Sequence, residues 1–167
     1  WLSVIVFDSE ARQLAPLAEL MQFQAPALKA TGTTAMGAAL ELLARCVTTE
    51  VTRTTAGQKG DWKPIVFLLT DGRSTDDLER GIAALKQARL GMLVACAAGP
   101  EADTGMLQRI TNAVVHLDTL DSSSIRAFFH WVSASIATTS QKVDLTKKDV
   151  GGLAELPPPP PEVNVVL

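Results

Sequence analysis

Ile-Val-Phe-Leu-Leu-Thr-Asp-Gly, residues 65–72, is an apolar run that stops abruptly at an aspartate and a glycine. A run of this length without polar alternation predicts a strand buried on both faces, and Asp-Gly predicts a sharp turn directly after it. Residues 1–7 (WLSVIVF) and 92–98 (MLVACAA) have a similar character. Three such strands predict a parallel sheet covered by helices on both faces.

Between these strands the apolar residues recur every three or four positions, which is typical of amphipathic helices. The pattern predicts helices over about 35–51, 78–88, 104–110 and 122–140, a strand over 113–117, and a short returning strand over 12–17 that Pro16 stops. In the last helix we expect the buried face to consist of Ile125, Phe128, Phe129, Val132 and Ile136. The predicted fold is therefore α/β: a three-layer sandwich with a mostly parallel, doubly wound, Rossmann-like sheet.

Helix starts can be predicted from Ser, Thr, Asp and Asn, whose side chains accept hydrogen bonds from the first free amides. We expect Thr33 or Thr34 to cap the helix at residue 35, and Asp76 or Asp77 to cap the helix at residue 78. Asp121 or Ser122 is expected to cap the last helix.

The chain has 167 residues, 47% of them hydrophobic and 20% charged, which suits one globular domain. We assign residues 1–140 to this domain and residues 141–167 to a Pro-rich tail. Five consecutive prolines at 157–161 predict a polyproline II rod, which suits a linker or a docking strip with an apolar end at 163–167.

Composition argues against several classes of partner. The net charge is −3 and the basic residues are scattered singly, so nucleic acid is not an expected partner. No apolar run approaches the ~20 residues of a membrane span.

Cys46 and Cys96 belong to no CxxC or Cys/His cluster, which indicates small buried residues and fits a reducing cytoplasm.

Enzyme motifs are scarce. The sequence has no G-x-S-x-G elbow, Gly-rich phosphate loop, H-E-x-x-H or zinc spacing. The best enzymatic alternative is Mg²⁺-dependent phosphoryl transfer on Asp71, at the end of a parallel strand. Arg73 stands where a second carboxylate is expected, so we favour a non-enzyme.

Three stretches carry a family resemblance: LSVIVFDSEA (2–11), ATGTTAMGAAL (30–40) and PIVFLLTDGRSTDD (64–77). They resemble the second strand, the threonine loop and the fourth strand of von Willebrand factor A-type (vWA) domains. The amino-acid sequence of these stretches is most similar to TerY-like proteins of tellurium-resistance and stress-response gene clusters. The resemblance implies a cytoplasmic protein-binding module, with a PP2C-type phosphatase and a Ser/Thr kinase as candidate partners.

In vWA domains a metal-ion-dependent adhesion site holds Mg²⁺ or Mn²⁺, and a carboxylate of the partner often completes the coordination. The resemblance implies Thr33 as the threonine ligand and Asp71 as the aspartate ligand, on neighbouring loops, with Thr34, Gly72 and Asp8 at the partner-binding rim. The family's first strand and helix, with its Asp-x-Ser-x-Ser loop, have no counterpart in this sequence. We therefore expect these residues alone to bind metal weakly or not at all.

The missing strand would lie between the strands at 1–7 and 65–70, so we expect a strand from elsewhere in that position. Residues 163–167 are a conceivable donor. For the function, a remaining alternative to the metal-assisted module is a structural scaffold that docks on its partner through the Pro-rich tail.

Overall fold

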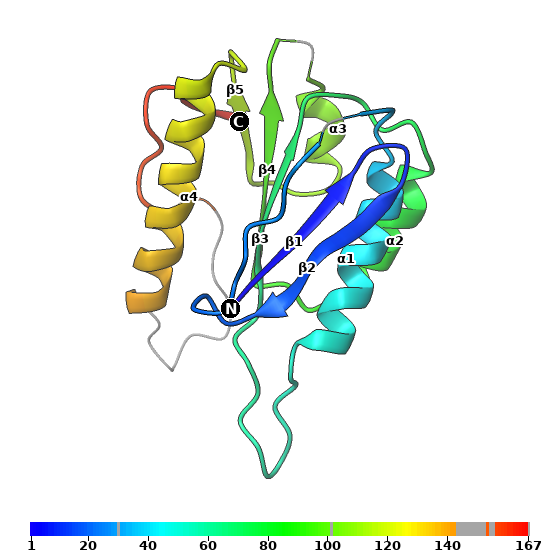
Figure 1. Cartoon of the computed structure of the whole chain (residues 1–167), viewed down its shortest axis with the longest axis vertical. Coiled ribbons are helices and arrows are strands. Elements are labelled where there is room, and N and C mark those ends of the chain that lie inside the picture. The colour runs from blue at the N-terminus through cyan, green and yellow to red at the C-terminus, as the bar shows by residue number, and fades with distance from the viewer. Residues whose placement is uncertain (30, 101, 143–152, 154–155, 167) are drawn as a thin grey trace. The chain divides into compact units, whose positions relative to one another are not determined.

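The computed structural model describes residues 1–167 except 30, 101, 143–152, 154–155 and 167, and it divides the chain into two compact units (Figure 1). Unit 1 consists of Trp1–Pro64 and Ser74–Arg89, and unit 2 consists of Ile65–Arg73 and Leu90–Leu167. Each unit is therefore assembled from segments that are distant in the sequence.

Unit 1 contains an antiparallel hairpin of β1 (Leu2–Phe7) and β2 (Ala11–Ala18). The prediction that Pro16 stops the second strand is wrong, because Pro16 lies inside β2. Among the described residues β2 pairs with β1 alone, so it is an edge strand, where the missing proline N–H is tolerated.

Two helices complete unit 1, namely α1 (Met36–Glu50) and α2 (Leu78–Gln87). They meet through glycines: a Cβ at Gly81 would lie 2.5 Å from the carbonyl oxygen of Gly37. The two helices pack together, and Met36 and Leu40 of α1 and Ile82 of α2 are buried. The predicted helical positions of these apolar residues are confirmed.

Unit 2 contains a four-stranded sheet in the order β3-β4-β5-β6. The strands β3 (Ile65–Thr70), β4 (Met92–Ala98) and β5 (Val114–Leu117) are parallel, as predicted. Figure 1 shows α4 (Ser122–Lys142) on one side of this sheet and α3 (Thr104–Gln108) on the other. All residues of β4 are buried, as expected for a central strand between two helical layers, and the α/β fold is confirmed.

A fourth strand, β6 (Val163–Val166), pairs antiparallel with β5 and was not predicted. Leu156 and Val163 are buried in the core of unit 2, and the indole Nε1 of Trp131 donates a hydrogen bond of 2.8 Å to the Pro157 carbonyl. The described part of the Pro-rich segment therefore packs within unit 2 and is not a free docking strip there. Residues 143–152, 154–155 and 167 of the expected tail lie outside the described residues.

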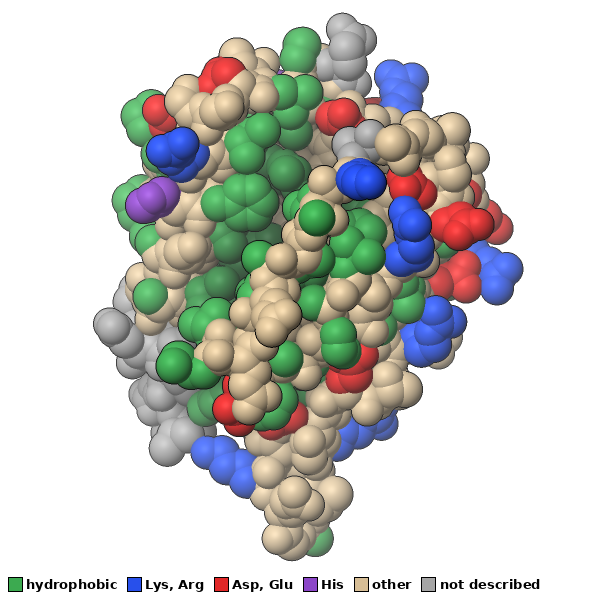
Figure 2. Space-filling view, in the orientation of Figure 1, with side chains coloured by type: hydrophobic (Ala, Val, Ile, Leu, Met, Phe, Trp, Pro, Cys, Tyr) green, Lys and Arg blue, Asp and Glu red, His purple; other side chains and the backbone are tan. Residues whose placement is uncertain are grey.

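The proposal of residues 163–167 as donor to a position beside β1 and β3 is wrong, since β6 occupies the edge at β5. Among the described residues β1 pairs with β2 and β3 pairs with β4, so β1 and β3 do not pair with each other. Among the described residues β3 pairs with β4 alone, and four of its six residues are half-buried. Figure 2 shows hydrophobic side chains open to view beside α4. A strand from elsewhere beside β1 or β3 stays a prediction.

The buried face of α4 differs from the predicted one. Phe129 and Ile136 are 51% and 43% exposed, so their assignment to the core is wrong. The buried residues of α4 also recur every three or four positions, but on a face that only partly overlaps the predicted one. They are Ser124, Phe128, Trp131, Val132 and Ser135. Trp131 takes the central place because its apolar ring packs edge-on to Phe67 while its N–H reaches a carbonyl.

None of the described helices, α4 included, is both long and apolar enough to cross a membrane. Cys46 and Cys96 are free and buried, which confirms the prediction of their burial.

Candidate functional site

The threonine loop, residues 31–34, lies against the turn of the β1–β2 hairpin in unit 1. The amide of Thr33 donates a hydrogen bond of 3.2 Å to Ser9 Oγ, and the amide of Ala35 donates one of 2.7 Å to the Asp8 carbonyl. Gly32 permits this approach, because its φ is +84° and a Cβ there would lie 2.4 Å from Ser9 Oγ. The hairpin turn thus holds one side of the loop.

The other side of the loop is held by the segment Ser74–Asp77, which precedes α2. Thr34 and Thr75 bond twice: the Thr34 amide donates to Thr75 Oγ1 at 3.2 Å, and the Thr75 amide donates to the Thr34 carbonyl at 2.9 Å. Both contacts lie within unit 1. The threonine loop is therefore fixed from two directions by backbone and hydroxyl groups.

Asp76 caps α1 from outside that helix. Its Oδ1 accepts the Gly37 amide at 2.8 Å and its Oδ2 accepts the Ala38 amide at 2.8 Å, while the Ser74 hydroxyl donates to Oδ1 at 2.7 Å. Partial burial alone would raise the pKa of Asp76, but the hydrogen bonds from Ser74, Ala38 and Gly37 together lower it. The carboxylate is thus held in its charged form at the positive end of the helix.

The prediction that Thr33 or Thr34 caps α1 is wrong. The N-cap position is Ala35, whose methyl side chain cannot accept a hydrogen bond, and the amides of Gly37 and Ala38 are bonded by Asp76 instead. The prediction for the next helix is confirmed, since Asp77 accepts from the Arg80 amide at 3.1 Å.

Thr33, which does not cap the helix, is exposed, and its Oγ1 lies 3.4 Å from Ser9 Oγ. The Asp8 carboxylate, by contrast, is engaged inside the hairpin, with Arg12 Nη2 at 2.7 Å and the Glu10 amide at 3.1 Å. The Glu10 amide is the largest influence that lowers the pKa of Asp8. Unit 1 therefore offers two hydroxyl oxygens side by side, next to an aspartate that already has partners.

In unit 2 the end of β3 is shaped by Thr70, which is 5% exposed. Its Oγ1 lies 3.4 Å from both the amide nitrogen and the carbonyl oxygen of half-buried Gly72. Between them Asp71 is exposed. Arg73 pairs with Asp103 at 3.2 Å, so its guanidinium is directed to another carboxylate of unit 2.

Thr33 belongs to unit 1 and Asp71 to unit 2, and their proximity stays a prediction. Hydroxyl and carboxylate oxygens are the donors that Mg²⁺ prefers. The described residues contain no group of three or more His, Cys, Asp or Glu that could hold a metal ion. The available oxygens thus fit Mg²⁺ in kind but are too few to hold it without further ligands.

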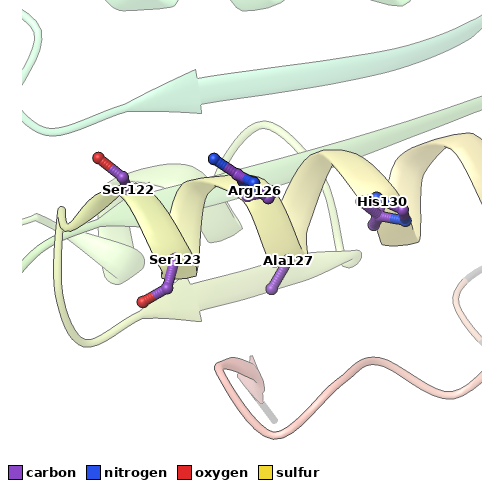
Figure 3. A pocket seen from close by; sticks show the side chains of 5 residues that line it. All are labelled: Ser122, Ser123, Arg126, Ala127 and His130. Atoms are coloured by element: carbon purple, nitrogen blue, oxygen red, sulfur yellow. The ribbon is translucent and has the colours of Figure 1, made fainter.

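A hollow in unit 2 lies elsewhere, along the exposed face of α4 (Figure 3), and contains none of the predicted site residues. It is lined by Ser122, Ser123, Arg126, Ala127 and His130. Asp121 caps this helix, as predicted, by accepting the amides of Ser123 and Ser124 at 2.8 and 3.0 Å.

The sequence interpretation missed the contributions of Ser9 and Asp76 to the threonine loop. A signal for Asp76 is present in the sequence, because two adjacent aspartates stand where one helix needs one cap. No comparable signal marks Ser9, whose role depends on a contact with a distant glycine.

Comparison with known proteins agrees with this architecture. The family model of the von Willebrand factor type A domain matches residues 2–129. No curated protein and no solved structure matches the chain. The match covers both the threonine loop and the aspartate at the end of β3, and the chain belongs to the von Willebrand factor type A domain family.

Proposed function

We propose that this chain binds a protein partner, and does so with the threonine loop and the Asp71 loop. The observation that carries the proposal is the state of Thr33: its loop is bonded on both sides, yet the residue itself is exposed. A loop fixed in this way presents a side chain without an entropic cost of ordering it on binding. Membership of a family of interaction modules supports the same conclusion.

The form of binding that the family suggests is metal-assisted, with Thr33 and Asp71 as the ligands that this chain contributes and Thr34, Gly72 and Asp8 at the rim. A Mg²⁺ or Mn²⁺ ion would supply an electrophilic position for a carboxylate of the partner. Because these residues are few, we expect the complete site to need water, the partner's carboxylate and other ligands in addition. Metal binding by the free chain is accordingly proposed to be weak.

The biological system, the cellular compartment and the identity of the partners are also proposals. The resemblance to TerY-like proteins suggests a tellurium-resistance or stress-response system in the cytoplasm, with a PP2C-type phosphatase and a Ser/Thr kinase as partners. The two free, buried thiols are compatible with a reducing compartment.

The test measures binding of a purified PP2C-type phosphatase and a purified Ser/Thr kinase from the same source, with Mg²⁺ and with EDTA. The variants are Thr33→Val, which removes the hydroxyl, and Asp71→Asn, which removes the negative charge and one carboxylate oxygen, each with little change of volume. Thr49→Val is the matched control, because Thr49 is an exposed threonine of α1 away from the loop. We expect affinity to fall at least about tenfold in both site variants and in EDTA, as the loss of a charge-assisted contact implies.

Binding that is unchanged by Thr33→Val, Asp71→Asn and EDTA alike would overturn the proposed site. We also propose that the chain is not an enzyme and expect no phosphatase activity above background with Mg²⁺. Activity that disappears in Asp71→Asn would instead assign it to phosphoryl transfer.

A further inference from the structure

We propose that Asp76 is the positioning residue of the threonine loop, holding Thr33 in its exposed place by capping the helix that follows it. The role of Thr33 in partner binding rests on the proposed function, whereas the positioning of the loop by Asp76 can be measured without any partner.

The first argument is that no other side chain among the described residues is seen to cap α1. Its N-cap residue Ala35 makes no side-chain hydrogen bond, and its first turn contains no acidic residue. The first amides of a helix need acceptors, and a negative charge there is favourable. The carboxylate of Asp76 supplies both, with one oxygen for the Gly37 amide and the other for the Ala38 amide, each at 2.8 Å.

The second argument is that the side chain of Asp76 is itself held in position by a neighbouring residue. The Ser74 hydroxyl donates to Oδ1 at 2.7 Å, and the following residue, Asp77, is fixed as the cap of α2. Close approach is possible because residue 37 is a glycine: a Cβ there would lie 2.3 Å from the Asp77 carbonyl oxygen and 3.1 Å from Asp76 Oδ2. The start of α1 is therefore held by the carboxylate of Asp76, and the start of α2 by that of the next residue, Asp77.

The third argument connects the cap to the ligand loop. Thr33 stands four residues before Gly37, so the capped start of α1 is close to it along the chain. Thr34 is bonded twice to Thr75, the neighbour of Asp76. If the carboxylate is removed, the first turn of α1 loses its acceptors, and the Thr34–Thr75 pair is left to hold that side of the loop alone.

The experiment uses the full chain with isotope-labelled amides and compares Asp76→Ala, Asp76→Asn and the control Asp77→Ala. The control removes a cap of the same chemistry, from the next residue, without a side-chain contact to the threonine loop. In Asp76→Ala we expect hydrogen exchange at Gly37 and Ala38 to accelerate at least about tenfold, and the amide resonances of Thr33 and Thr34 to shift. Asp76→Asn keeps one acceptor oxygen and should be intermediate.

A loop that is merely destabilised with the whole unit would give the same thermal shift in both alanine variants and equal exchange changes. Unchanged Thr33 and Thr34 resonances in Asp76→Ala, or equal changes in Asp77→Ala, overturn the positioning role. A parallel Mn²⁺ titration of the unmodified chain follows the broadening of Thr33 and Asp71 resonances. Absence of broadening in the unmodified chain counts against the metal-assisted function alone, because the exchange experiment contains no metal.

Discussion

The docking of the C-terminal segment on unit 2 can be tested with one substitution made at two places. Val163 and Val165 lie two positions apart in the same four-residue strand and differ sharply in burial. Val163 is 3% exposed and belongs to the core beside Leu117, whereas Val165 is 42% exposed. Replacing each by threonine keeps shape and β-propensity and adds a hydroxyl.

The magnitude follows from this difference in burial. At position 163 the hydroxyl enters an apolar cluster, and an unsatisfied buried hydroxyl costs about 1–3 kcal/mol. At position 165 it faces water, and an exposed substitution of this kind changes stability by less than about 0.5 kcal/mol. For a chain of this size the first change lowers the melting temperature by roughly 2–12 °C.

Urea unfolding followed by circular dichroism and tryptophan fluorescence measures both variants against the unmodified chain. We expect the midpoint to fall in Val163→Thr and to stay in place in Val165→Thr. If the unfolding free energies of the two variants agree within about 0.5 kcal/mol, then β6 does not pack on β5 in solution and residues 156–166 are a detached tail.

Three further predictions concern groups with unusual surroundings. Burial raises the pKa of the Cys96 thiol to about 12, so a thiol reagent at pH 8 should leave Cys96 unmodified in the folded chain and modify it in urea, as mass spectrometry can show. Hydrogen bonds, the largest from the Ser123 hydroxyl, lower the pKa of Asp121 below its ordinary 3.8. Its stabilising effect is therefore complete above that value and is lost as the pH falls below it, so the pH dependence of stability between about pH 5 and 2 should be shallower in Asp121→Ala. Gly37→Ala places a Cβ 2.3 Å from a backbone carbonyl oxygen and should cost roughly 1–3 kcal/mol, whereas Gly57→Ala, with nothing within 4 Å of its Cβ, should be neutral in calorimetry.

Most of the secondary structure could be predicted because its signals are local. The strand at Ile65–Thr70 has the bounds predicted for it, since an uninterrupted apolar run ends at a turn-forming Asp-Gly. The strand at Met92–Ala98 also has its predicted bounds, and it is buried on both faces as its composition indicates. In these elements the residue pattern and the tertiary environment favour the same structure.

The elements that were missed depend on contacts between distant segments. Val163–Val166 is too short to be distinguished from an apolar chain end, and it becomes a strand because β5 offers an edge. On α4, the helical period allows two neighbouring faces, and periodicity alone does not choose between Phe129 and Trp131. The choice is made by the Pro157 carbonyl, which gives the buried indole N–H an acceptor.

The same distinction applies to the candidate site and explains why the predicted cap of α1 was wrong. Capping rules assign a helix start to the nearest Ser, Thr, Asp or Asn, which favours Thr33 or Thr34 for α1. A cap requires only an acceptor at the right place in space, and Asp76 reaches that place from the loop before another helix. A cap at Thr33 would commit one lone pair of its hydroxyl to a helix amide and restrict how that oxygen can meet a ligand. Because Asp76 accepts the helix amides instead, the Thr33 hydroxyl makes no such bond, which suits the proposed role of Thr33 in binding. The local sequence around Thr33 does not reveal this arrangement.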